Sequence, residues 1–149
     1  MNEAFKRYFE AIGLSTETMM TRIQALIDQA VQMLHREVVD VFVNNYFRED
    51  GTIAYTDLEL ITNDLLVSFH DFAVEQSEQV MTVVGIPANY PYFRIAHNSY
   101  DLKKATEKSR LSVELRWGDS GSWQYRAAGA NCDYLMAIVR NRFSPRTGR

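Results

Sequence analysis

Apolar residues follow a helical period over the first third of the chain. Residues 3–12 predict a short amphipathic helix that ends at Gly13. A long helix is predicted over residues 17–47, because apolar residues recur there at alternating spacings of three and four: Met20, Ile23, Ile27, Ala30, Leu34, Val38 and Val41. The β-branched valines from Val38 to Val43 lower the helix propensity of its end, so a strand over 38–43 is the alternative.

A second long helix is predicted over residues 57–84. Thr56 or Asp57 provides its N-terminal cap, and Gly85 and Pro87 end it. Its apolar residues fall on one helical face: Leu58, Ile61, Leu65, Phe69, Phe72, Ala73, Val80, Val83 and Val84. Because the connection between the two long helices is short, we expect them to be antiparallel neighbours in a helical hairpin.

The hydrophobic period changes to roughly two residues after Pro91, which is typical of strands. Strands are predicted over 92–98, 110–117 and 122–128, with a turn at 118–121 between the last two. A final helix is predicted over 131–143, followed by a polar and basic tail over 144–149 that we expect to be frayed.

These elements predict an α+β fold in a single domain over residues 1–149. Its helical half covers 1–86 and contains the short helix and the long antiparallel hairpin. Residues 90–143 hold a three-stranded antiparallel sheet and the C-terminal helix. A length of 149 residues and a hydrophobic fraction of 46% are sufficient for one core without disulfides or metals.

Composition bears on the compartment. The single cysteine, Cys132, excludes an intramolecular disulfide, and the acid-containing N-terminus lacks the apolar segment of a signal peptide. The chain has no apolar run of the ~18 residues that a membrane-spanning helix needs. We therefore expect a cytoplasmic protein that does not enter a membrane.

Polar residues of the predicted sheet suggest a binding surface. Strand alternation places Arg110, Glu114 and Arg116 on one face, with Gln124 and Arg126 across the hairpin and Arg94 on the third strand. Clustered guanidinium groups bind phosphate, carboxylate or an acidic partner, although an ordinary solvated face is the alternative. Trp117, Trp123 and Tyr125 alternate to the other side of the sheet, so stacking platforms are missing and nucleic acid is an unfavoured partner.

Glu37 is unusual because it falls within the apolar arc of the predicted first long helix. A buried carboxylate must be paired, hydrogen-bonded or protonated, so Glu37 is a candidate for lining a ligand pocket together with Arg94, Arg116 and Arg126. The alternatives are a structural salt bridge, or a helix that rotates or ends before residue 37.

Two patterns raise the possibility of a metal site. Asp50, Gly51 and Ile53, followed by Asp57, resemble the second half of an EF-hand calcium loop, but Tyr46 and Arg48 stand where its first and third oxygen ligands belong. In the predicted hairpin, His35 and His70 lie at the same height. Neither histidine has the His-x-x-x-His or Glu-x-x-His spacing of a metal-binding helix, so no metal is predicted.

Cys132 is the candidate nucleophile, because it lies near the start of the predicted last helix, where the dipole lowers the pKa of a thiol. His97 and an aspartate would complete a catalytic set. The alternative is a small buried residue that packs the helix on the sheet.

The leading functional hypothesis is a non-catalytic protein-interaction or regulatory module. We expect a homodimer through the long helices, because the first helix carries apolar residues beyond its main stripe: Met19, Met33, Val39, Phe42 and Val43. A small-molecule or anion sensor is the second hypothesis, and an enzyme using Cys132 and His97 is the third. No cofactor is predicted, because the chain lacks a phosphate loop and a dinucleotide glycine fingerprint.

Overall fold

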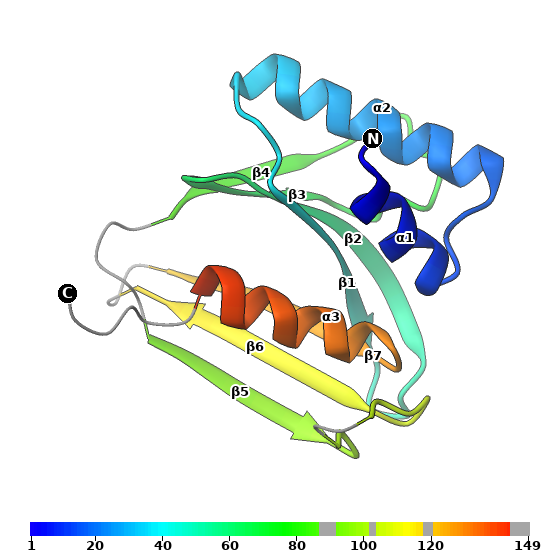
Figure 1. Cartoon of the computed structure of the whole chain (residues 1–149), viewed down its shortest axis with the longest axis vertical. Coiled ribbons are helices and arrows are strands. Elements are labelled where there is room, and N and C mark those ends of the chain that lie inside the picture. The colour runs from blue at the N-terminus through cyan, green and yellow to red at the C-terminus, as the bar shows by residue number, and fades with distance from the viewer. Residues whose placement is uncertain (87–91, 102–103, 118–120, 144–149) are drawn as a thin grey trace. The chain divides into compact units, whose positions relative to one another are not determined.

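The computed structural model describes residues 1–86, 92–101, 104–117 and 121–143. Figure 1 shows the helices and strands that these residues form. In chain order they are α1 (Glu3–Ala11), α2 (Glu17–Leu34), β1 (Asp40–Phe47), β2 (Ile53–Ile61), β3 (Leu65–Phe69), β4 (Met81–Gly85), β5 (Tyr92–Asn98), β6 (Arg110–Arg116), β7 (Ser122–Ala128), α3 (Asn131–Ile138) and the short π-helix η1 (Val139–Phe143).

The strands form two sheets. One sheet has the order β1-β2-β3-β4 and the other the order β5-β6-β7. The pairs β2–β3, β3–β4, β5–β6 and β6–β7 are antiparallel.

The chain divides into two compact units, and β1 and β2 contribute to both. The first unit holds Met1–Phe42 and Thr56–Ile86, and the second holds Val43–Tyr55 and Pro87–Arg149.

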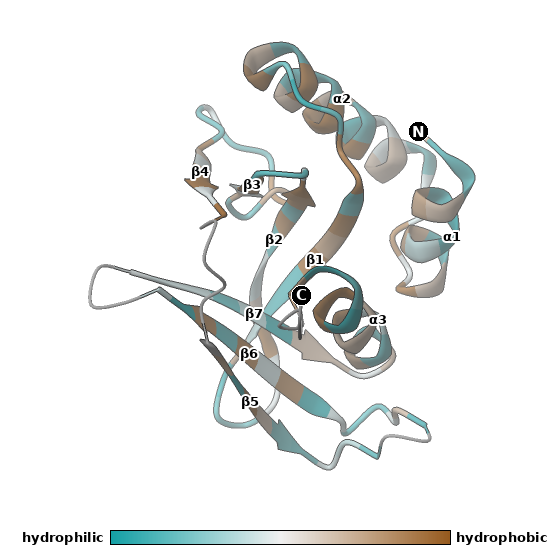
Figure 2. Ribbon diagram, turned by 60° about the vertical axis from the view of Figure 1, so that its left-hand side comes forward, coloured by the Kyte–Doolittle hydropathy of each residue, from teal (hydrophilic) through white to brown (hydrophobic). Residues whose placement is uncertain are grey.

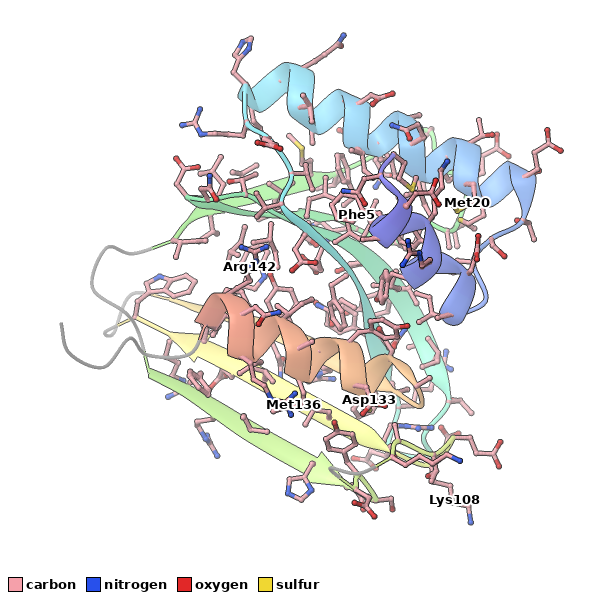
Figure 3. The ribbon with its side chains drawn as sticks, viewed as in Figure 1. Phe5, Met20, Lys108, Asp133, Met136 and Arg142 are labelled. Carbon is pink, nitrogen blue, oxygen red and sulfur yellow. The ribbon has the colours of Figure 1, made fainter. Side chains whose placement is uncertain are left out.

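The core of the first unit lies between the helices and the sheet. Thr16 caps α2, since its hydroxyl oxygen accepts a hydrogen bond from the backbone N–H of Met19 at 3.3 Å. Phe5 of α1 lies beside α2 (Figure 3). The ring of Tyr8 stacks on Phe42 of β1, with centroids 6.5 Å apart. Further core residues are fully buried: Phe9, Ile23, Leu58, Leu60, Val67, Phe69 and Phe72.

The core of the second unit lies between the three-stranded sheet and α3 (Figure 1). Apolar and polar residues alternate along β6, as the bands in Figure 2 show, and its apolar positions are buried. The ring of Tyr125 on β7 stacks on Phe143, with centroids 5.9 Å apart. Further buried apolar side chains of this core are Leu111, Val113, Leu115, Ala127, Cys132, Leu135, Ile138 and Val139.

The predicted first long helix is too long. Helix α2 ends at Leu34, and His35 adopts the left-handed conformation with φ 52°. Residues 40–47 form β1, as the strand alternative for 38–43 indicated in part. The valines of this segment explain the outcome, because β-branched side chains favour strands over helices.

The predicted second long helix is wrong, and with it the helical hairpin. Residues 57–84 form most of β2, all of β3 and most of β4. A tight turn joins β2 to β3, where the hydroxyl oxygen of Thr62 accepts a hydrogen bond from the backbone N–H of Leu65 at 2.8 Å. The apolar residues of this segment fit a strand period as well as a helical one, and its many β-branched residues favour strands.

The α+β class and the three-stranded antiparallel sheet are present. The sheet pairs β5, β6 and β7 with the strand bounds that the alternation predicted, to within one residue. The last helix is α-helical only to Ile138 and continues as η1. The predicted turn at 118–121 and the tail at 144–149 lie largely outside the described residues. No helix in the described part of the chain is long and apolar enough to cross a membrane.

Substitutions in β2 and directly before β4 distinguish the strands from the predicted helix. Leu60 of β2 is fully buried, although it lay off the apolar face of the predicted helix, whereas Val80 lay on that face and is 49% exposed. We expect Leu60→Ala to lower the free energy of unfolding by about 2–5 kcal/mol, because it leaves a cavity in the core. Val80→Ala should change it by less than about 1 kcal/mol.

Urea denaturation of both variants measures this difference. As a control for an intact fold, the wild type and both variants should have the same far-UV circular dichroism spectrum. A larger loss for Val80→Ala than for Leu60→Ala would contradict the strand assignment.

Candidate functional site

The predicted arginine cluster lies on one face of the three-stranded sheet. In the β-sheet register, Arg94 pairs with Glu114 and Glu114 pairs with Gln124, while Ser112 pairs with Arg126. Directly paired residues point to the same side of an antiparallel sheet. We define the arginine face by Arg94, Arg110, Glu114, Arg116, Gln124 and Arg126, and it lies opposite the face that carries the buried apolar residues.

Glu114 is the only carboxylate that the three strands place on the arginine face. Its Oε1 lies 2.6 Å from Nε of Arg116 in an ion pair. Arg94 pairs with Glu114 in the register from β5 and is exposed. One negative charge therefore stands between two guanidinium groups, and the face retains a positive charge.

Arg110 and Arg126 are fixed by the tip of the β1–β2 hairpin, which belongs to the same unit. Arg110 Nη2 donates to the carbonyl oxygen of Gly51 at 2.7 Å. The guanidinium of Arg126 lies over the rings of Tyr46 and Phe47, 5.7 Å from each centroid. Both arginines are half-buried, so they anchor the hairpin and offer only part of each side chain to a ligand.

Sequence reasoning missed the aromatic residues of this surface, because they come from a hairpin distant in the chain. Tyr46 stacks on Tyr55 with centroids 4.4 Å apart and ring planes 14° apart. Tyr55 is 46% exposed. The expectation that the arginine face has no stacking residues therefore holds only for the residues that β5, β6 and β7 themselves contribute.

Two asparagine side chains connect the hairpin to the edge of β7, and a third connects the hairpin to the start of α3. Asn44 is fully buried, and its Oδ1 accepts from the backbone N–H of Arg126 at 2.6 Å, while its Nδ2 donates to the carbonyl oxygen of Gln124 at 2.9 Å. Asn45 Oδ1 accepts from the backbone N–H of Ala128 at 3.2 Å. Asn131 completes the set, since its Nδ2 donates to the carbonyl oxygen of Val43 and to Asn45 Oδ1.

Electric charge is divided unequally between the units. The second unit holds 12 of the 16 Lys and Arg residues and 7 of the 19 Asp and Glu residues, a formal charge of +5. The first unit holds the other 4 basic and 12 acidic residues, a formal charge of −8. The net charge of −3 therefore conceals a basic unit that carries the arginine face.

Glu37 does not lie in an apolar arc, because α2 ends three residues before it, and its side chain is exposed. It lines a shallow open groove of the first unit with Phe5, Ile27 and His35. The expectation of a buried carboxylate at this position is wrong, since the helix on which it depended stops at Leu34.

Neither predicted metal pattern forms a metal centre. Asp50 and Gly51 form the turn of the β1–β2 hairpin, where hydrogen bonds from the backbone and the hydroxyl of Thr52 lower the pKa of the Asp50 carboxyl. His35 ends α2 in the left-handed conformation. Within the described ranges, no three His, Cys, Asp or Glu side chains come together as metal ligands.

A second cluster of reactive side chains lies in the first unit, on β2, on β4 and on the residue that directly follows β3. Nδ1 of His70 lies 3.2 Å from Oδ2 of Asp57, and Nε2 of His70 lies 2.6 Å from Oγ1 of Thr82. The Asp57 side chain is 2% exposed and the His70 side chain 43% exposed. On the same sheet face, the hydroxyl of Ser68 donates to Oε1 of buried Glu59 at 3.0 Å.

Sequence reasoning placed these residues on a helix and therefore missed the cluster, apart from naming His70 and Asp57 separately. The signal that could have found it is a polar alternation. Asp57 and Glu59 alternate with Leu58 and Leu60 along β2. Ser68 on β3 and His70, the residue directly after β3, are also two positions apart.

Cys132 does not have the environment of a nucleophile. Its side chain is fully buried, and Sγ donates to the carbonyl oxygen of Ala127 at 3.4 Å. Burial, assisted by the charge of Asp133, raises the pKa of the thiol to about 11. The same Asp133 (Figure 3) accepts a hydrogen bond from the hydroxyl of Tyr100 at 2.9 Å. His97, the proposed base, is exposed on β5.

Comparison of the chain with protein-family models, curated proteins and solved structures finds no match.

Loss of Asn44 should destabilise the protein strongly. Asn44→Ala leaves the carbonyl of Gln124 and the N–H of Arg126 without their amide partner. Two buried polar groups without partners cost about 2–5 kcal/mol together. Urea denaturation should show this loss, whereas Asn63→Ala, at an exposed turn position, should stay within about 0.5 kcal/mol. Equal stability of the two variants would mean that the asparagine contacts contribute little.

Cys132 should be protected from alkylation. At pH 8 the buried thiol stays protonated, because its pKa of about 11 lies above the ordinary value of 9.0. We expect iodoacetamide to label Cys132 in urea but not in the native protein, as measured by intact-protein mass spectrometry. The free energy of unfolding should also fall as the pH rises from about 9 to about 11, because the unfolded thiol ionises first. Rapid labelling of the native protein would contradict this assignment.

Proposed function

We propose that the protein is an interaction module whose second unit binds an anionic partner through the arginine face. The observation that carries this proposal is the set of four guanidinium groups that share one sheet face with a single carboxylate, Glu114. Guanidinium groups suit carboxylate and phosphate ligands, because they donate two parallel hydrogen bonds.

Two features of the face favour binding. Arg110 and Arg126 are held by backbone carbonyls and aromatic rings, so little side-chain freedom is lost when a ligand arrives. Arg94 and Arg116 are exposed and supply the accessible charges. A partner with spaced negative charges could contact several of these groups at once, whereas a lone carboxylate would compete with Glu114 for Arg116.

The expected homodimer through two long helices loses its basis, because the second helix is a set of strands. Of the apolar residues that suggested an interface, Phe42 and Val43 are buried within the chain. Met33 is 59% exposed, and a single exposed methionine does not define an interface. The proposal therefore rests on charge.

Heparin is a suitable polyanionic probe for this surface. We expect Arg94→Ala and Arg116→Ala each to weaken heparin binding roughly tenfold, since each removes a charge-assisted contact of about 1.5–3 kcal/mol. Isothermal titration calorimetry at low salt measures the affinity. The melting temperature should change by no more than a few degrees, because exposed charges contribute little to stability.

Arg7→Ala is the matched control, because Arg7 is an exposed arginine of the first unit. It should leave the affinity for heparin unchanged. If Arg7→Ala weakens binding as much as Arg94→Ala, the interaction follows overall charge and the arginine face is not the site. The proposal is also wrong if Arg94→Ala and Arg116→Ala both bind heparin as tightly as the wild type.

A further inference from the structure

The chain of side chains from Asp57 to Thr82 defines the direction in which a proton can move. Asp57 is a buried carboxylate, and an ionised carboxylate only accepts hydrogen bonds. Nδ1 of His70 therefore carries the proton in this contact and donates it to Oδ2 of Asp57. In the neutral imidazole Nε2 is then left as the acceptor, so the hydroxyl of Thr82, 2.6 Å away, is its donor.

This order is the one that activates a hydroxyl nucleophile. A neutral imidazole accepts the hydroxyl proton while a carboxylate fixes its tautomer and orientation. A structural role for His70 would be complete with the contact to Asp57. The short contact to Thr82 in addition directs the hydroxyl proton onto the basic nitrogen of the ring.

The backbone around His70 is held in place by several further contacts. Oδ1 of Asp57 accepts from the backbone N–H of Asp71 at 2.8 Å, where Asp71 adopts a left-handed conformation with φ 48°. The side-chain amides of Gln76 and Gln79 both donate to the carbonyl oxygen of His70, at 3.1 and 2.8 Å. The imidazole is thus positioned before any substrate arrives, which is what catalysis by a fixed base requires.

Asp57 is buried, whereas His70 and Thr82 are partly exposed to solvent. Asp57 is shielded from water, so its contact with His70 is not weakened by solvent. His70 is 43% exposed and Thr82 is half-buried on the strand β4 at the edge of its sheet. A small acyl compound can therefore approach the hydroxyl from solvent, whereas the carboxylate stays out of reach.

We propose that Thr82, His70 and Asp57 form an acyl-transfer site for small esters, separate from the arginine face. Oγ1 of Thr82 attacks the ester carbon while its proton moves to Nε2 of His70. The ester C–O bond then breaks, and the leaving alcohol takes that proton. Water then attacks the acyl carbon while one of its protons moves to Nε2 of His70. The bond between that carbon and Oγ1 breaks, and Oγ1 of Thr82 takes the proton back, so that the carboxylic acid leaves and the free hydroxyl is restored.

p-Nitrophenyl acetate is the probe for this site. We expect release of p-nitrophenol together with an acetyl group on Thr82, located by peptide mass spectrometry. Thr82→Val, which keeps the shape of the side chain, should abolish this acetylation, and His70→Ala should slow it by roughly 10²–10⁴-fold. Thr82→Ser should restore acetylation at residue 82, because the serine hydroxyl can occupy the same place.

Controls separate this site from surface chemistry and from loss of fold. His97→Ala is matched to His70→Ala, because an exposed histidine also reacts with the probe, and it should leave acetylation of Thr82 unchanged. Circular dichroism confirms that each variant is folded. If the folded wild-type protein carries acetyl groups only on lysines or exposed histidines, or if acetylation of Thr82 proceeds equally in His70→Ala, the proposal is wrong. Heparin binding by the same samples tests the arginine face independently.

Discussion

The outer edge of β7 must find hydrogen-bond partners, and the amide side chains of asparagines provide them. An edge strand exposes unpaired N–H and C=O groups that invite pairing with another chain. Asn44 binds one carbonyl and one N–H of β7 as a neighbouring strand would, and Asn45 accepts from a second N–H of that strand. Asn131 of α3 holds this segment in place, since its amide donates to Asn45 and to the carbonyl oxygen of Val43. Side chains thus take the place of a backbone ladder, and the edge of the sheet is closed without a fourth strand.

This attachment determines the character of the arginine face. It brings Tyr46 and Phe47 against Arg126, so that guanidinium groups which would repel one another are stabilised by rings and carbonyl oxygens. The unit that carries this face has a formal charge of +5, whereas the whole chain has a net charge of −3. The net charge of the chain alone does not reveal such a surface.

The sequence predicted the arginine face but not the reactive cluster, for a physical reason. In β6 and β7, strict alternation and flanking turns leave one assignment, and alternation alone decides which residues share a face. Between residues 57 and 84, Leu58, Ile61, Leu65 and Phe69 follow a helical period, whereas Leu58 and Leu60, and then Leu65, Val67 and Phe69, follow a strand period. There, pairing between strands decides the secondary structure. It places His70 between Asp57, which is 13 positions earlier in the chain, and Thr82, which is 12 positions later. Spacing along one chain cannot reveal such neighbours when the element is assigned wrongly.

Strand β2 shows what the polar cluster costs. Asp57 and Glu59 are each 1% exposed and alternate with Leu58 and Leu60, so the second half of the strand is buried on both faces while one face carries carboxylates. Burial of a carboxylate is unfavourable by several kcal/mol unless hydrogen bonds compensate for the lost water. Apolar residues at both positions would give a simpler and more stable sheet. That the chain instead surrounds Asp57 with donors and leaves the attached His70 open to solvent is best explained by a chemical use of the imidazole.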